Sequence, residues 1–185
     1  MSYYIPLIIA LLFYLARIRE FLIKRNTVKG PIVEKNSFRF LFAGGTIVVL
    51  GSIVEYLTFD RNPGWLLILI GCVFGLAAFV YRNWAIRTLG KFWSVHVEIR
   101  DNQPLIKSGP FKRIRHPVYT AAILEVLGAV ILLQAYISAV LIPLLVLPAI
   151  LYRINIEEKE LVGKFGKDYL DYKKKTGALI PKLFQ

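Results

Sequence analysis

The sequence predicts an all-α, polytopic membrane protein with five transmembrane helices, the last two forming a helical hairpin, and a cytosolic C-terminal helix. Hydrophobic residues make up 56% of the 185 residues and charged residues only 19%. A typical soluble domain has less of the first and more of the second. The apolar residues are also gathered into long blocks, which is the pattern of membrane-spanning helices. Finally, almost all the positive charges lie in the segments after the first, third and fifth blocks, flanks included.

A helix needs about 20 apolar residues to cross the hydrocarbon core of a bilayer. The first block lacks a basic leader and a small-residue cleavage site, so we interpret it as a retained helix and not as a signal peptide. The last two blocks are slightly short and flank a tight turn at Tyr136, which favours a hairpin. Pro143 and Pro148 are expected to kink the fifth helix. The expected helices cover about residues 4–23, 38–59, 65–86, 118–134 and 138–154.

The basic residues predict an orientation for this bundle. Of the 24 lysines and arginines, all but Arg61 lie after the first helix, after the third helix or in the C-terminal tail, flanks included. Cytoplasmic loops carry such an excess, so we expect the N-terminus outside and the C-terminus in the cytosol. The net charge of +12 is then a matter of topology and of contact with membrane lipids, and it requires no nucleic-acid partner.

Cytosolic segments at about residues 87–117 and 155–185 are expected to complete a cofactor site, so residues 1–185 are interpreted as one membrane-embedded domain. From Asn155 the chain is expected to leave the membrane as a helix that ends near Gly177 and Pro181. Its apolar positions are spaced as a single stripe; they are Leu161, Phe165, Tyr169 and Tyr172.

Several kinds of site are excluded or disfavoured. One cysteine, Cys72, permits no internal disulfide, and with only two histidines we predict no metal site. The sequence has no Walker loop, no dinucleotide-binding glycine motif at the start of a helix and no nucleophile elbow. Gly71 and Gly75 form a GxxxG pair in the third helix, which indicates close helix packing.

A few polar residues near the membrane are candidates for chemistry. Glu125 lies two turns into the fourth helix, where an ionisable group is costly; it either lines a site or makes a structural hydrogen bond. Arg153 and Glu157 are spaced i, i+4 and either pair with each other or bind separate ligands. The roles of Glu55 and His96 stay open.

Two sequence blocks carry a resemblance to a known family. "LIKSGPFKRIRHPVY" is followed, about 35 residues later, by "RINIEEKELVGKFGKDYLDYKK". Together they resemble the isoprenylcysteine carboxyl methyltransferase family of integral membrane enzymes over about residues 85–176. The positions that match the family pattern are Leu105, Gly109, Arg115, His116, Pro117, Tyr119, Arg153, Glu157, Glu158, Leu161, Phe165, Gly166, Tyr169 and Tyr172.

The resemblance implies S-adenosylmethionine as the methyl donor and a lipophilic carboxylate, prenylated cysteine in the type enzyme, as the acceptor. It implies that Arg153 contacts the acceptor's carboxylate. Two positions depart from the pattern: Gln103 stands where relatives often have His, and Phe111 where many have Tyr. The cofactor-binding positions that it implies are Gln103, Leu105, Ile106, Phe111, His116, Pro117, Val118, Tyr119 and Glu157.

A carboxylate acceptor is already ionised at neutral pH, so its methylation needs alignment and desolvation and no general base. A thiol or amine acceptor would need a base, for which Glu125, Glu158 and His116 are candidates. Two alternatives remain: an NADPH-dependent sterol-type membrane reductase, which shares the Arg-His-Pro-x-Tyr motif, and a non-catalytic lipid-binding or scaffold protein. The reductases typically have Asn where this chain has Val118.

Overall fold

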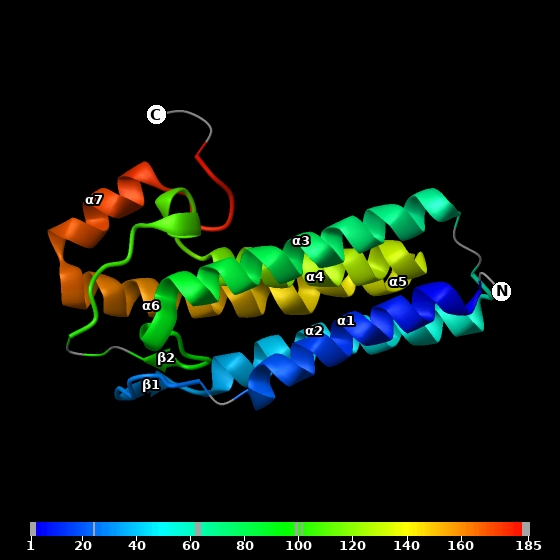
Figure 1. Cartoon of the computed structure of the whole chain (residues 1–185), viewed down its shortest axis with the longest axis horizontal. Coiled ribbons are helices and arrows are strands. Elements are labelled where there is room, and N and C mark those ends of the chain that lie inside the picture. The colour runs from blue at the N-terminus through cyan, green and yellow to red at the C-terminus, as the bar shows by residue number, and fades with distance from the viewer. Residues whose placement is uncertain (1–2, 24, 62–63, 99, 101, 183–185) are drawn as a thin grey trace.

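The computed structural model describes residues 3–23, 25–61, 64–98, 100 and 102–182. Lys24 of the charge count, part of the turn after the second helix and the last three residues lie outside this part. The described chain forms an elongated helical bundle (Figure 1). Its long helices are α1 (Tyr4–Leu22), α2 (Asn36–Thr58), α3 (Trp65–Leu89), α4 (Pro117–Leu133) and α6 (Leu147–Phe165).

The helix positions follow the sequence closely, and three of them are long and apolar enough to cross a membrane. In the described part of the chain these are residues Asn36–Thr58, Trp65–Phe92 and Tyr136–Phe165. Helix α4 is apolar but shorter, and α1 carries Arg17, Arg19 and Glu20 in its last turns. Many large apolar side chains on the outer faces are exposed, Leu66, Leu69 and Val80 among them. The fold is that of a membrane protein, and five spans remain a prediction.

The expected fifth helix is interrupted where its prolines lie. It begins as α5 (Tyr136–Ala139), continues as a π-helical segment at Ile142–Val146 and then becomes α6. A proline cannot donate the intrahelical hydrogen bond and its ring displaces the preceding turn, and single π-turns are a common way to accommodate such a break. The predicted kink is therefore a local change of helix type around Pro143.

The C-terminal helix differs from the expectation. Helix α6 continues without a break from the apolar segment to Phe165, and the chain then turns at Gly166, whose φ is +52°. A short helix, α7 (Lys167–Lys175), follows. The prediction of one continuous helix with a single apolar stripe, ending near Gly177, is wrong. Gly166 adopts a backbone conformation that only glycine takes easily, and it ends α6. Tyr169 and Tyr172 therefore lie on a separate helix.

In the described part of the chain, the all-α class holds except for one small sheet. Strands β1 (Ile32–Glu34) and β2 (Val97–Glu98) pair antiparallel with an irregular register. They join two segments far apart in sequence, so no local pattern indicated them. The Glu34 carboxylate accepts hydrogen bonds from the Asn36 and Ser37 amides at the start of α2. The sheet thus fixes the entrance of α2 beside β2.

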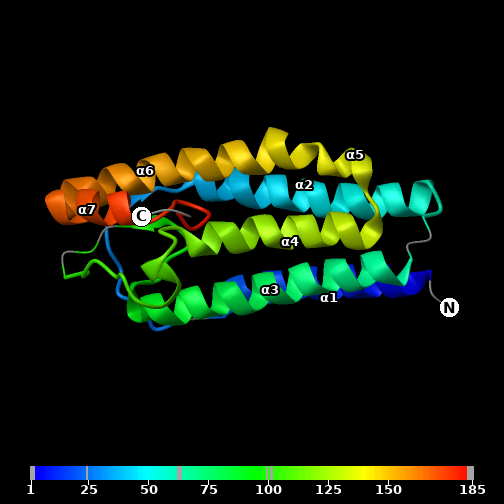
Figure 2. The same ribbon diagram turned by 90° about the horizontal axis from the view of Figure 1, so that it is seen from above.

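Helix α4 lies at the centre of the bundle, between α2 and α3 (Figure 2), and it also contacts α1. Its closest neighbour is α3, and the glycines explain why. A Cβ added at Gly71 would lie 2.7 Å from Leu132 Cβ, and one at Gly128 would lie 3.0 Å from the Gly75 amide nitrogen. The close packing that the GxxxG pair predicted is confirmed, and α4 is its partner.

The two ends of the bundle are different. The sheet, the segment before α4, α7 and the C-terminal residues gather at one end, and the N-terminus lies at the other end (Figure 1). The segments that carry almost all the lysines and arginines therefore do share one end, as the charge pattern required. Their cytosolic orientation stays a prediction.

Candidate active site

The segment that leads into α4 is held by the C-terminal residues. A short 3-10 helix, Gly109–Lys112, turns the chain toward Pro117. The backbone amides of Arg115 and His116 then donate to the carbonyl oxygens of Gly177 and Ala178, at 2.9 and 3.0 Å. Residues 177–179 thus act as a strap across the start of α4, and the strap fixes where the His116 side chain points.

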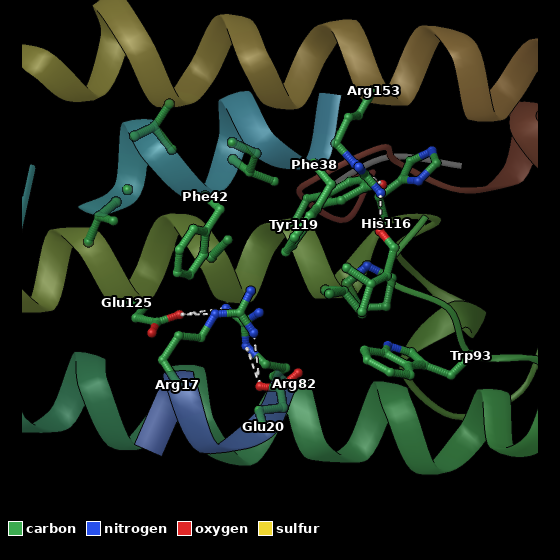
Figure 3. A pocket seen from close by; sticks show the side chains of 18 of the residues that line it. Arg17, Glu20, Phe38, Phe42, Arg82, Trp93, His116, Tyr119, Glu125 and Arg153 are labelled. Atoms are coloured by element: carbon green, nitrogen blue, oxygen red, sulfur yellow. Dashed lines mark hydrogen bonds and ion pairs between the residues drawn. The ribbon is translucent and has the colours of Figure 1, made fainter. Parts of the chain in front are cut away.

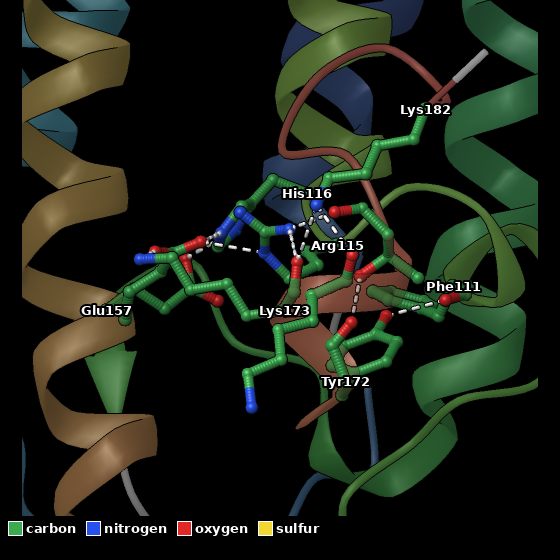
Figure 4. A network of polar contacts seen from close by, with 10 residues as sticks. Phe111, Arg115, His116, Glu157, Tyr172, Lys173 and Lys182 are labelled. Carbon is green, nitrogen blue, oxygen red and sulfur yellow. Dashed lines mark hydrogen bonds and ion pairs between the residues drawn. The ribbon is translucent and has the colours of Figure 1, made fainter. Parts of the chain in front are cut away.

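Arg115 and Tyr172 attach α7 to the same segment (Figure 4). Arg115 Nε donates to Glu158 Oε1 at 2.8 Å, and its guanidinium also donates to the Thr176 carbonyl oxygen. The Tyr172 hydroxyl donates to the Phe111 carbonyl oxygen at 2.5 Å. Burial raises the pKa of Tyr172 to about 12, so this hydroxyl remains a donor at all ordinary pH values.

His116 lies between two carboxylates. Its Nε2 is 3.2 Å from Glu158 Oε1 and its Nδ1 is 3.5 Å from Glu157 Oε2. Burial alone would lower the pKa of His116, but the charges and hydrogen bonds of Glu157 and Glu158 outweigh it and raise the pKa above its usual value. An imidazolium donates from both nitrogens. The arrangement therefore speaks against His116 as a general base.

Arg153 and Glu157 do not form the direct pair that their spacing allowed. The Tyr119 hydroxyl stands between them: it accepts from Arg153 Nε at 3.0 Å and donates to Glu157 Oε2 at 2.9 Å. The Tyr119 ring stacks on His116 with centroids 5.6 Å apart. The first turn of α4 and the middle of α6 therefore build one polar group.

The remaining partners of Arg153 are neutral. Nη1 donates to Ser37 Oγ at 3.1 Å and Nη2 to the Val95 carbonyl oxygen at 2.8 Å. The side chain is almost fully buried. Among the described residues, no carboxylate hydrogen-bonds to this guanidinium. A buried guanidinium with no carboxylate hydrogen-bonded to it favours an anionic ligand.

These residues open onto one large cavity between α1, α2, α3, α4 and α6 (Figure 3). Most of its lining is apolar, with Phe38, Phe42, Val49 and Val126 prominent. The structure brings together, around this cavity, the following residues that the sequence singled out: Phe111, His116, Pro117, Val118, Tyr119, Glu125, Arg153 and Glu157. Gln103, Leu105 and Ile106 are not among its lining residues; the Gln103 side-chain oxygen is buried and has no partner in the described part of the chain.

The sequence did not single out a second polar group on this cavity. Arg82 Nη2 lies 2.6 Å from Glu125 Oε2, and Arg17 Nη1 lies 2.9 Å from Glu20 Oε2. Arg17 also lies 3.7 Å from Glu125, and Arg82 lies 3.8 Å from Glu20. We call Arg17, Glu20, Arg82 and Glu125 the charge quartet. Its only sequence signal was the position of charges inside apolar blocks.

The open questions about Glu55 and His96 are also answered by position. Glu55 accepts from the Ile137 and Ser138 amides and from the Ser138 hydroxyl, so it holds α5 against α2. His96 packs edge-on against Phe38, with centroids 6.0 Å apart. Neither lines the cavity.

Comparison with known proteins agrees with this architecture. The sequence profile of the isoprenylcysteine carboxyl methyltransferase family matches residues 67–163. The chain is 28% identical over 128 residues to the protein YpbQ of Bacillus subtilis, covering 69% of this chain and 75% of that protein. It is 30% identical over 114 residues to the protein-S-isoprenylcysteine O-methyltransferase of Saccharomyces cerevisiae, covering 60% of this chain.

A solved structure of a eukaryotic intramembrane Ras methyltransferase of the same family superimposes with a TM-score of 0.63 and 29% identity over 74% of this chain. The chain spans about half of these enzymes, 48% of the yeast protein and 51% of the solved chain. The residues that match the family profile include most of α3, all of α4, most of α6, the whole first motif block and the first half of the second. The chain therefore belongs to the isoprenylcysteine carboxyl methyltransferase family.

Proposed function

We propose that the protein transfers a methyl group from S-adenosylmethionine to the carboxylate of a lipophilic acceptor within the membrane. The observation that carries this proposal is Arg153: a buried guanidinium on an apolar cavity, held only by neutral partners among the described residues. A carboxylate is the ligand that its planar fork of donors fits best.

The residues around His116 suit the cofactor. Phe111, Pro117 and Val118 offer apolar surface for a flat base. The Glu157 side chain keeps 34% of its surface exposed, so its carboxylate can accept from an amine or a ribose hydroxyl in addition to Tyr119. When bound, S-adenosylmethionine supplies an electrophilic methyl group. We call His116 with its two carboxylate partners, Glu157 and Glu158, the His116 clamp. The clamp and the Tyr119 hydroxyl hold the Glu157 carboxylate in place for this contact.

The chain's own part in the reaction is then to bind, orient and desolvate the acceptor. Arg153 orients the carboxylate, and Tyr119, Ser37 and Val95 fix the guanidinium. The apolar lining removes water from the carboxylate, which makes it a better nucleophile. No proton has to leave the acceptor, so the raised pKa of His116 is compatible with this chemistry.

An apolar cavity between membrane helices also favours a lipophilic acceptor. Yeast and plant relatives are called protein-S-isoprenylcysteine O-methyltransferases, so an isoprenylcysteine-like carboxylate is the first acceptor to test. The cytosol is the expected side for the cofactor, since the basic segments and the start of α4 share one end of the bundle.

The decisive experiment is incubation of the purified protein in lipid nanodiscs with methyl-labelled S-adenosylmethionine and lipophilic carboxylates, thiols and amines. We expect base-labile label on carboxylates, and its loss in Arg153→Ala. Saturable NADPH binding with no label transferred would favour the reductase instead. The absence of saturable binding of either cofactor would favour a scaffold.

A further inference from the structure

The charge quartet lines the cavity that contains Arg153 but belongs to a different part of it. Figure 3 shows Glu125, Arg17, Glu20 and Arg82 gathered beside Phe42, with His116 and Arg153 on the other side of Tyr119. All four quartet residues line the cavity. The cavity therefore has the polar site around Arg153 at one side, an apolar middle, and the charge quartet as a second polar site.

The quartet is electrically balanced but incompletely hydrogen-bonded. It contains two arginines and two glutamates that alternate. The Arg82 side chain is 4% exposed, and its Nη1 has no hydrogen-bond partner within the described part of the chain. The Glu20 Oε1 atom is likewise buried and has no hydrogen-bond partner among the described residues. Arg82 and Glu20, which both line the cavity, thus leave one buried donor and one buried acceptor without a partner among the described residues.

Such atoms are rare in folded proteins because each loses its hydration without compensation. A hydrocarbon chain in this part of the cavity would leave both atoms unsatisfied. An anion would meet two carboxylates, and a cation would meet two guanidinium groups. A neutral group that both accepts and donates a hydrogen bond, of which a hydroxyl is the simplest, satisfies both atoms and disturbs neither ion pair.

We propose that the charge quartet is a specificity site for the acceptor, and that the preferred acceptor carries a neutral hydrogen-bonding group, a hydroxyl or an amide, at the far end of an apolar body from its carboxylate. This inference rests on the proposed function, because it takes the carboxylate to lie at Arg153. The inference goes beyond the proposed function because it expects the protein to discriminate against an acceptor with a purely hydrocarbon tail.

The test uses the full chain in nanodiscs with ω-hydroxy fatty acids of graded length and the unsubstituted acids of equal length. Methyl transfer from labelled S-adenosylmethionine gives kcat/KM, and calorimetry gives binding independently of turnover. At the best-fitting length we expect the hydroxy acid to be favoured by at least roughly tenfold, since a site built for a hydroxyl rejects the analogue that lacks it.

Arg82→Met and Glu20→Met, which remove the unpaired donor and the unpaired acceptor, should each reduce the ratio of the two kcat/KM values toward one. Arg61→Met is the matched control: it also removes an arginine paired with a glutamate, Glu55 at 3.5 Å, but Arg61 does not line the cavity. It should keep the preference. The wild-type comparison needs no variant, so a variant that fails to fold does not weaken the test.

Equal or better use of the unsubstituted acids at every length would overturn the specificity site and leave the methyltransferase proposal standing. A hydroxyl preference that persists in both Arg82→Met and Glu20→Met would also overturn it. If no carboxylate is methylated although S-adenosylmethionine binds, the proposed function is wrong, and the calorimetric comparison still decides whether the quartet recognises the hydroxyl.

Discussion

Arg153 and Glu157 lie one turn apart on α6, yet they are joined through the Tyr119 hydroxyl of α4, at 3.0 Å from Arg153 Nε and 2.9 Å from Glu157 Oε2. The hydroxyl lets the two charged groups share a site without a direct hydrogen bond between them. Under the proposed function, Glu157 is then available to the cofactor and Arg153 to the acceptor. Their substitution should therefore produce two different defects.

Arg153→Ala should leave the affinity for S-adenosylmethionine within a few-fold of wild type but strongly reduce carboxylate methylation. A lost charge-assisted contact of about 1.5–3 kcal/mol corresponds to roughly 10- to 150-fold. Arg153→Lys should recover only part of the lost methylation rate, because an ammonium lacks the planar fork. Glu157→Ala should instead weaken cofactor binding. The measurements are calorimetry and methylation rate, and equal losses of cofactor affinity in both alanine variants would contradict the division of roles.

The pH dependence of stability should report the His116 clamp. The folded-state pKa of His116 is raised by Glu157 and Glu158 against the effect of burial, while its unfolded pKa is about 6.5. Its contribution is therefore complete below pH 6.5 and is lost as the pH rises through the folded pKa. Thermal unfolding between pH 5 and 10 should show this decline, and His116→Gln should remove it.

His96→Gln is the control for that experiment, since its ring faces Phe38 and no carboxylate forms an ion pair with it among the described residues. The decline with pH should persist in this variant. A wild-type stability that rises steadily from pH 6.5 upward would mean that the clamp does not hold a protonated imidazole.

Gly71 should tolerate no side chain. An alanine Cβ there would lie 2.8 Å from the Leu132 backbone, so α3 and α4 would have to separate, at a cost of about 1–3 kcal/mol. Gly163 provides the contrast, because a Cβ on this α6 residue meets nothing within 4 Å. Gly163→Ala should stabilise by about 0.5–1 kcal/mol. Unfolding in mixed detergent micelles compares them, and equal effects would refute the close packing.

Glu55 should be a structural residue. Glu55→Ala would leave the Ile137 and Ser138 amides without their acceptor, and we expect a loss of about 1.5–3 kcal/mol. Glu55→Gln should retain part of this stability, since the glutamine amide oxygen still accepts a hydrogen bond. Asp171→Asn, which breaks the exposed pair with Lys174 at 3.1 Å, should cost less than about 1 kcal/mol. A Glu55→Ala protein as stable as Asp171→Asn would remove the assigned role.

The orientation in the membrane can be tested separately. Single cysteines at Asp60 and Lys174 in a Cys72→Ser background should be labelled from opposite sides by a membrane-impermeant reagent, with Lys174→Cys reacting from the cytosol. The reason is the position of nearly all basic residues at one end of the bundle. Labelling of both cysteines from one side would exclude the predicted five-span topology.

Much of this fold was predictable because its signals are local. Apolar block length located α1 to α4 within a few residues of their ends, and the spacing of Gly71 and Gly75 indicated a close helix contact. The two motif blocks named most of the residues around Arg153 and His116 that the structure brings together. The helix positions and the glycine contact depend on neighbours within a few turns of the same helix, whereas the residues around Arg153 and His116 were named by the family resemblance.

The features that escaped prediction depend on partners far apart in sequence. Glu125 meets Arg82 from 43 positions away, and Arg153 meets Ser37 from 116 positions away. Nothing in the residues around Ser37 indicates such a contact. The break at Gly166 was missed for another reason: the apolar spacing continues through it, although the backbone does not. A periodic pattern shows which residues are apolar and not whether the helix between them is continuous.

The strap at residues 177–179 has a consequence for the protein's synthesis. The carbonyl oxygens of Gly177 and Ala178 hold the backbone of Arg115 and His116, and Arg115 and Thr176 are 61 positions apart. On the ribosome, every helix of the bundle is made before the strap. The backbone of the His116 segment can therefore reach its observed position only after residues 177–179 have been translated, so its order depends on the last part of the bundle to be made.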